Sequence, residues 1–143
     1  MIYRRQLLLG GAALGVSGLV VDAHAAGLVV VVNKSVSQAS FSKTELAAIF
    51  TTRKRNYDGG QRIIPLNLPP RQSQRVEFDN KVLGMSPDEI ARYWIDRKVR
   101  GGNSPPRHVP SAALVARLVD KLPGCIGYVP SSLAGNLKIV ARV

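Results

Sequence analysis

The sequence predicts an α/β domain with a three-layer α/β/α architecture, in which helices cover both faces of a mostly parallel sheet. Three observations support this prediction. Leu28–Val32 is a run of five β-favouring apolar residues, the pattern of a strand buried on both faces. Two Ser-x-x-Glu segments, Ser42–Glu45 and Ser86–Glu89, are capping boxes that satisfy free backbone N–H groups where a helix begins. Strand-like and helix-like segments then follow one another, as in layered α/β domains.

The first predicted strand is followed by a polar, Ser-rich loop over residues 33–40. The helix that begins at the Ser42 cap is expected to end near Thr51. Its apolar residues recur at helical spacing and predict one buried face, made of Leu46, Ile49 and Phe50. The basic residues at 53–55 and the Asp-Gly-Gly at 58–60 then predict an exposed turn.

A second strand is predicted over residues 62–68. Pro65 lacks an N–H donor, so we expect a strand end, a bulge or a sheet edge at this position. Two further prolines end the strand, and a helix is predicted from about Gln72 to Leu83. We expect this helix to bury Val76, Val82 and Leu83, and to bury Phe78 in part.

The C-terminal half is predicted to contain two more helices and two short strands. Pro87 occupies the first position after the Ser86 cap, where its missing N–H costs nothing. Trp94 lies at helical spacing from Ile90, and we expect it to belong to the core. A further helix begins at the Ser111 cap, with Leu114, Val115, Leu118, Val119 and Leu122 directed inward. The strands are expected at 126–129 and 137–141.

Residues 1–25 have the organisation of a secretory signal peptide. Arg4-Arg5 form a basic start, residues 7–21 are uncharged and mainly apolar, and Ala23-His24-Ala25 is a cleavage site of small residues. A permanent membrane anchor is the alternative, but a spanning helix needs about 20 apolar residues. The paired arginines also resemble a twin-arginine export signal. We therefore expect a periplasmic or secreted domain, residues 26–143, with no stable membrane span after cleavage.

The chain is strongly basic, with a formal net charge of +11. Basic charge commonly indicates a nucleic-acid partner, but export from the cytoplasm argues against one. Small anions, an acidic protein partner or an anionic membrane surface remain as partners. The alternative is that the surplus charge only keeps the protein soluble.

The sequence offers little for catalysis. Within residues 26–143 the only histidine is His108, which has no cysteine or acidic residue at ligand spacing. The single cysteine, Cys125, lies among apolar residues and is expected to be buried. Glu77 and Asp79 are close in sequence but do not share a helix face, so they make a weak acid–base pair. We predict no catalytic residue, no metal site and no cofactor, and therefore no enzyme.

One segment is suited to binding an anion. It is the predicted strand-to-helix junction, with candidate ligands Arg71, Gln72, Ser73, Gln74 and Arg75. The first N–H groups of a helix lack backbone partners and carry partial positive charge, which favours an oxyanion such as phosphate. Arginine side chains can add charge-assisted donors. The alternative is an ordinary helix start with solvated arginines.

Several motifs resemble the substrate-binding protein of phosphate ABC transporters. They are Ile49-Phe50, Tyr57-x-Gly59, the Ile-x-Pro-Leu strand at 63–66, Ser73 with Phe78, Trp94 and, as the most specific, Leu122-Pro-Gly-Cys-Ile-Gly-Tyr-Val129. The resemblance implies one lobe of a type II periplasmic binding fold without enzymatic activity. In that family an Arg and a Ser-Gly-Thr turn hold phosphate. Arg71 and Ser73 stand at the Arg and Ser positions, and Gln74 and Arg75 replace Gly and Thr.

Two functions follow from these observations. The first is a binding domain that takes phosphate or another small oxyanion, with low affinity because one lobe leaves its ligand open to water. A homodimer or a partner protein could supply the opposite wall. The second is an adaptor that has lost its ligand and docks an acidic envelope protein through a basic face, formed by Arg53, Lys54, Arg55, Arg97, Lys98 and Arg100.

Overall fold

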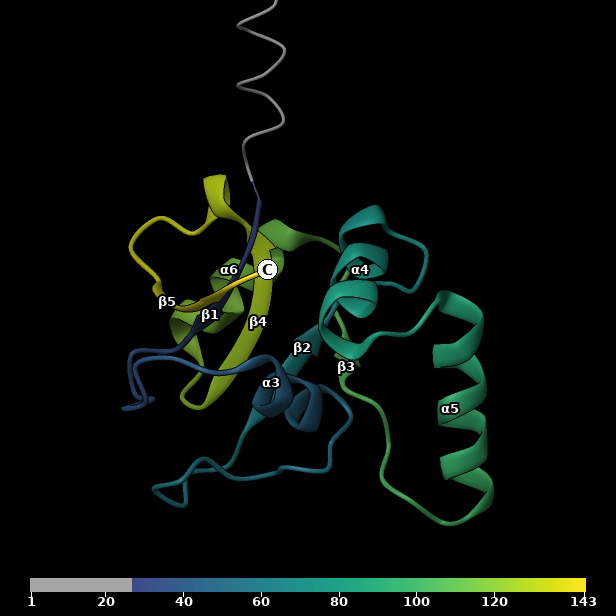
Figure 1. Cartoon of the computed structure of the whole chain (residues 1–143). Coiled ribbons are helices and arrows are strands. Elements are labelled where there is room, and N and C mark those ends of the chain that lie inside the picture. Colours follow the sequence, from purple (N-terminus) through teal and green to yellow (C-terminus); the bar gives the residue numbers. More distant parts are fainter. Residues whose placement is uncertain (1–26) are drawn as a thin grey trace, which may run out of the picture.

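The computed structural model describes residues 27–143 and consists of one five-stranded sheet with helices on both faces (Figure 1). The predicted signal peptide at 1–25 lies outside the described residues. The strands follow the order β3-β2-β4-β1-β5 across the sheet. Their bounds are β1 (Leu28–Val32), β2 (Ile64–Asn67), β3 (Arg107–His108), β4 (Cys125–Pro130) and β5 (Lys138–Arg142).

The sheet is mixed but mostly parallel, as predicted. β2 is parallel to β3 and to β4, whereas β1 is antiparallel to both β4 and β5. Strands β2, β3, β4 and β5 therefore point the same way, and β1 alone runs in the opposite direction. All five β1 residues are buried, as predicted. Burial on both faces depends on the covering layers rather than on strand direction, so the apolar run could not reveal that β1 is the antiparallel strand.

The helices are α3 (Lys43–Phe50), α4 (Ser73–Phe78), α5 (Pro87–Val99) and α6 (Ala112–Lys121). The π-helix η1 (Asp79–Leu83) continues α4, and the 3₁₀ helix η2 (Ser131–Leu133) follows β4. Two successive residues of β4 identify the three layers, because neighbouring residues of a strand point to opposite faces of the sheet. Gly127 faces α6, because a Cβ added there would lie 2.5 Å from Cγ1 of Val115. Tyr128 faces the other side and contacts α3 and α4.

An aromatic cluster holds α3 and α4 on the sheet. The Phe78 ring stacks on the Tyr128 ring with centroids 3.9 Å apart, and the edge of Phe50 meets both at 4.8 and 5.9 Å. Each such pair contributes about 0.5–1.5 kcal/mol beyond its burial. Phe78 is fully buried, which corrects the expectation that it lies only partly inside. The correction follows from the flat Tyr128 ring on β4, which the helix pattern alone could not indicate.

Pro65 lies within β2, between β3 and β4 in strand order, yet it behaves locally as an edge residue. Its partner on β4 is Ile126, whereas pairing with β3 begins only at Leu66. At Pro65, β2 therefore has a neighbouring strand on one side only, so the missing N–H costs no hydrogen bond between strands. The expectation of an edge is confirmed for this position but not for the whole strand.

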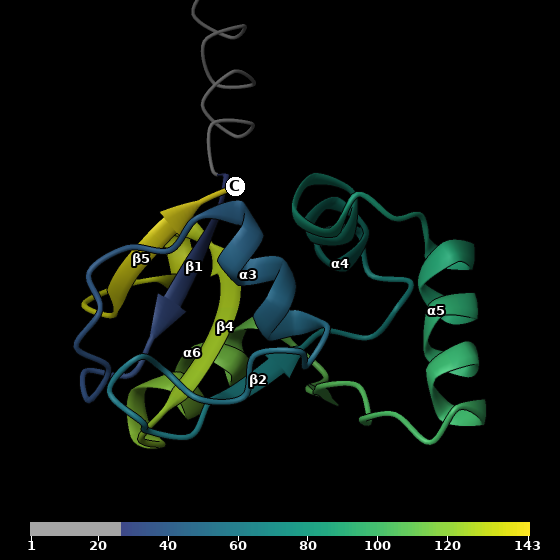
Figure 2. The ribbon, with the colours of Figure 1, turned by 60° about the horizontal axis from the view of Figure 1, so that its bottom comes forward.

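The α5 helix differs from the others because it stands away from the sheet (Figure 2). Its capping box at Ser86 and Glu89 is formed as predicted. Ile90 is its only buried residue, and Ile95 and Val99 are 63% and 81% exposed. Trp94 is only partly buried and does not belong to the core, so that prediction was wrong. Helical spacing identifies an apolar side but not whether another layer covers it.

The predicted burial of the single cysteine is confirmed. Cys125 is fully buried, and this burial raises the pKa of its thiol to about 11, which suits an inert core residue. None of the helices described for residues 27–143 is long and apolar enough to cross a bilayer.

Candidate functional site

A buried polar network fixes the turn that leaves the carboxyl end of β2. The side-chain oxygen of Asn67 accepts hydrogen bonds from the Tyr128 hydroxyl and, at 3.0 Å, from the Leu68 N–H. Asn67 and Tyr128 are 4% and 1% exposed. A buried amide needs such partners, since an unpaired one costs about 1–3 kcal/mol. The network therefore determines the direction in which residues 68–72 approach α4.

Arg75 belongs to the same buried region. Its Nε donates to a carboxylate oxygen of Asp79 at 2.7 Å, and its Nη1 donates to the Leu68 carbonyl at 2.8 Å. Both side chains of the ion pair are at most 4% exposed. Burial raises the pKa of Asp79, and the positive charge of Arg75 opposes that rise. The guanidinium thus ties the start of α4 to the turn that precedes it.

The start of α4 is uncapped by any side chain. Helices α3, α5 and α6 each begin with a serine whose hydroxyl accepts a backbone N–H, namely Ser42, Ser86 and Ser111. At α4 the N-cap residue is Gln72, and it makes no side-chain cap bond. Its amide instead donates to the Pro110 carbonyl at 2.9 Å. The first N–H groups of α4 are therefore left for solvent or a ligand.

The five predicted anion ligands divide into two groups. Arg71 and Ser73 are exposed, and Gln72 and Gln74 are partly exposed, so these four lie at the surface of the α4 start. Arg75 is buried with its donors directed to internal acceptors. The geometry gives Arg75 a positioning role rather than direct contact with a ligand. Asp79, four residues further along the helix, supplies the partner that turns it inward.

His108 lies beside this helix start, although the sequence placed it in a loop. It belongs to the two-residue strand β3, where it pairs with Asn67, and the adjoining Val109 N–H donates to the Asn67 carbonyl at 2.7 Å. Partial burial and the charge of Arg75 lower the pKa of His108. A strand of two residues between prolines carries no periodic signal, so sequence reasoning missed it.

The described residues offer no metal centre at this end of the sheet. Among residues 27–143, no group of three or more His, Cys, Asp or Glu side chains could hold a metal ion. Ligands of open α/β sheets commonly bind beyond the carboxyl ends of the strands. The uncapped α4 start occupies that position on β2.

Solved structures of similar fold include phosphate-transport proteins. An ABC-type phosphate transport receptor from Vibrio cholerae is 17% identical with a TM-score of 0.63, and the match covers 80% of this chain and 45% of the receptor. PstS from Borrelia burgdorferi is also 17% identical, with a TM-score of 0.62, covering 81% of this chain and 47% of PstS. No family model matches the sequence, and no similar sequence is found among curated proteins. The resemblance read from the motifs is thus confirmed at the level of the fold, and the chain spans slightly under half the length of these structures.

Proposed function

We propose that this chain is a non-enzymatic solute-binding domain that takes phosphate or another small oxyanion at the start of α4. The observation that carries the proposal is the uncapped helix start at the carboxyl end of β2, in a fold shared with phosphate receptors. Exposed Arg71 and Ser73 would add a guanidinium and a hydroxyl to the free N–H groups.

Binding at this position is expected to be weak. The α4 start opens to solvent, so an anion there keeps part of its hydration and competes with dissolved salt. A two-lobed receptor encloses its ligand and strengthens each polar contact by excluding water. We therefore expect a dissociation constant in the high micromolar range or above, falling as ionic strength is reduced.

His108 provides a local reporter for the test. A phosphate bound at the α4 start would favour the imidazolium form and raise the pKa of His108. The experiment is an NMR titration of the His108 ring between pH 5 and 8, with and without 20 mM phosphate, using chloride at matched ionic strength as the reference. The expected result is a higher His108 pKa in phosphate and movement of the Ser73 and Gln74 amide signals.

Two substitutions separate this site from general charge effects. Arg71→Gln should weaken phosphate binding several-fold, because it removes a charge-assisted donor at the ligand. Arg117→Gln removes one positive charge from the exposed side of α6 and should leave binding unchanged. Unchanged signals at 73–75 in 20 mM phosphate would rule out oxyanion binding here and would favour the adaptor hypothesis.

The cellular location belongs to the same proposal. We infer that residues 1–25 are removed on export and that the domain acts in the periplasm or outside the cell. Mass spectrometry of protein recovered from the periplasmic fraction should give a chain that begins at Ala26. Recovery of the protein only in the cytoplasm, with Met1 retained, would contradict this inference.

A further inference from the structure

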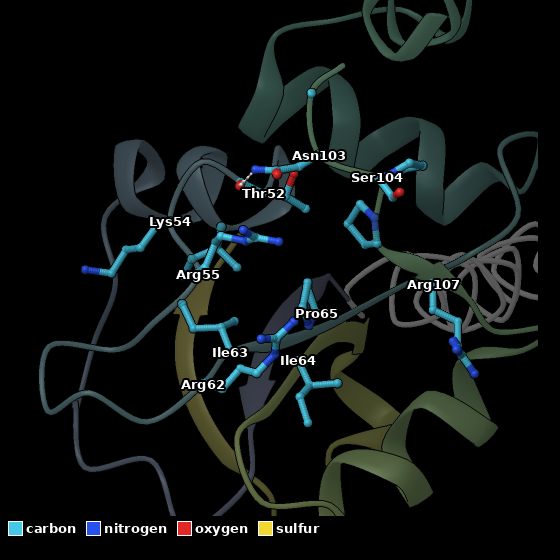
Figure 3. Close-up of a pocket in the computed structure, with 14 residues that line it drawn as sticks. Thr52, Lys54, Arg55, Arg62, Ile63, Ile64, Pro65, Asn103, Ser104 and Arg107 are labelled. Carbon is cyan, nitrogen blue, oxygen red and sulfur yellow. Dashed lines mark hydrogen bonds between the residues drawn. The ribbon is translucent and has the colours of Figure 1, made fainter. Parts of the chain in front are cut away.

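A second basic region lies at the other end of β2, away from the α4 start. A hollow lies between the end of α3, the hairpin of residues 55–63 and the segment 102–107 (Figure 3), and its volume is about 480 Å³. Pockets of a few hundred Å³ accommodate small organic molecules. A single tetrahedral ion would leave most of this volume to water.

The charge of the hollow is positive and largely uncompensated. Lys54, Arg55, Arg62 and Arg107 line it, and no carboxylate does. Lys54 is neutralised by Asp58 at 2.8 Å and points away from the hollow in Figure 3. Within residues 27–143, the side chains of Arg55 and Arg62 form no hydrogen bond or ion pair with another side chain or with the backbone, and Figure 3 shows Arg55 extending into the hollow.

The walls are held by hydrogen bonds, so the hollow is formed before any ligand arrives. The Ile63 N–H donates to the Arg55 carbonyl at 2.9 Å, and this bond holds the two sides of the hairpin, which carry Arg55 and Arg62, next to each other. The Tyr57 hydroxyl donates to the Gly124 carbonyl at 2.9 Å and ties the hairpin to the start of β4. On the opposite wall, the Asn103 amide donates to the Thr52 carbonyl at 3.0 Å. Preformed walls reduce the entropic cost of binding.

The rest of the lining is mixed: Thr52, Asn103 and Ser104 are polar, and the isoleucines and prolines form an apolar part. Ile63 is buried, Ile64 is 38% exposed, and Pro65 lies next to it. Pro105 and Pro106 contribute from the far segment. Forked guanidinium donors match the planar, bidentate geometry of a carboxylate. An apolar surface beside them matches a hydrocarbon body attached to that carboxylate.

We propose that this hollow binds a small organic acid, with its carboxylate on Arg55 and Arg62 and its apolar body over Ile64 and Pro65. The site is separate from the oxyanion site of the proposed function, because the two lie at opposite ends of β2. The proposed ligand class also differs, since this hollow combines arginines with Ile64 and Pro65. One site can therefore exist without the other.

The test compares two aromatic probes of equal shape, 2-naphthoate and its neutral amide, 2-naphthamide. Each is titrated into the purified protein at pH 7 and followed by NMR. Naphthoate should move the signals of residues 55, 62–64 and 103. It should bind about ten-fold more tightly than naphthamide, because the neutral amide cannot form charged hydrogen bonds with the arginines. Inorganic phosphate at 5 mM should not displace it.

Substitutions then assign the charges. The Arg55→Gln, Arg62→Gln double variant should lose about ten-fold or more in naphthoate affinity and leave naphthamide affinity unchanged. Lys54→Gln is the matched control, because it removes a lining charge that is already paired, and it should change affinity less than two-fold. Ile64→Ser should weaken both probes alike, since it removes apolar contact from each.

Several outcomes would overturn the proposal. Equal affinity for the two probes would show that charge plays no part. A loss in Lys54→Gln as large as in the double variant would show only long-range attraction to a basic protein. Signals that move at 71–75 instead of the hollow would place the organic acid at the α4 start. No shift at 55, 62–64 and 103 up to 10 mM naphthoate would show that the hollow does not bind this class of ligand.

Discussion

The body of the molecule and the α5 segment are built from similar local signals but reach different degrees of packing. In the body, α3 buries Leu46, Ile49 and Phe50 against a sheet whose central strand β4 is almost wholly buried. α5 has an equally good capping box and more turns, yet only Ile90 is buried. Both regions contain aromatic residues, but those of the body stack on one another across layers, whereas Tyr93 and Trp94 contact each other on a single exposed helix.

A cap and a helical period are therefore sufficient to form a helix, but they do not pack it into a layer. Stability in the body comes from contacts between elements far apart in the sequence, such as Phe50, Phe78 and Tyr128. α5 depends mainly on its own hydrogen bonds, its cap and the Arg97–Tyr93 contact. Four predictions test the contacts that stabilise the body, and the third of them compares the body directly with α5.

The largest effect is expected from the buried ion pair in the body. Arg75→Ala leaves the Asp79 carboxylate buried without its partner and the Leu68 carbonyl without its donor. Breaking a buried pair in this way should lower the free energy of unfolding by about 3–5 kcal/mol. Urea denaturation gives the value. Arg71→Ala, four residues earlier and exposed, should change it by less than about 0.5 kcal/mol, and equal losses would refute the distinction between these two arginines.

The next effect tests the close approach of α6 to the sheet. Gly127→Ala places a methyl group 2.5 Å from Cγ1 of Val115, so the helix must shift. Overpacking of this kind should cost about 1–3 kcal/mol in unfolding free energy. Gly59→Ala is the control, because a Cβ there meets nothing within 4 Å. Its unfolding free energy should be unchanged or rise by up to about 1 kcal/mol, because alanine makes the unfolded chain less flexible.

A smaller effect compares the two capping boxes directly. Ser42→Ala and Ser86→Ala each remove a hydroxyl that accepts the N–H of a glutamate three residues later. Each loss should be worth about 1 kcal/mol. In α3 the loss should appear as lower global stability, because this helix is part of the core. In α5 it should appear as faster amide hydrogen exchange within 87–99 at nearly unchanged global stability, and identical exchange profiles would contradict the contrast.

The smallest effect concerns pH at His108. Partial burial and the Arg75 charge lower the folded-state pKa of His108. At pH values near and between the folded and unfolded pKa values, the unfolded chain therefore binds more protons than the folded one. The protein should therefore lose stability as the pH falls from the ordinary histidine pKa of 6.5 through the folded value. The difference in urea midpoint between the protein and His108→Gln, measured from pH 5 to 7.5, isolates this contribution. The prediction would be contradicted if the unsubstituted protein became more stable relative to His108→Gln as the pH falls.

The candidate site was predictable only in part. The strand-to-helix junction at 68–75 is readable from Pro69-Pro70 followed by helical spacing, and the structure places that junction at the carboxyl end of β2. The sequence does not reveal that Arg75 turns inward, because its acceptors come from Asp79 and from the Leu68 carbonyl fixed by Asn67. It also does not bring His108 to the site, because β3 exists only through its pairing with β2.

What the sequence alone determined is the local structure: the apolar strand at Leu28–Val32, the serine caps and the turns at prolines and glycines. These depend on interactions within about four residues, which the chain carries with it. The folded chain was needed to reveal the antiparallel direction of β1, the exposure of α5 and the basic hollow between segments some 50 residues apart. Those features form where segments far apart in the sequence pack against one another. Their geometry depends on the packing of the whole domain and not on any single stretch of sequence.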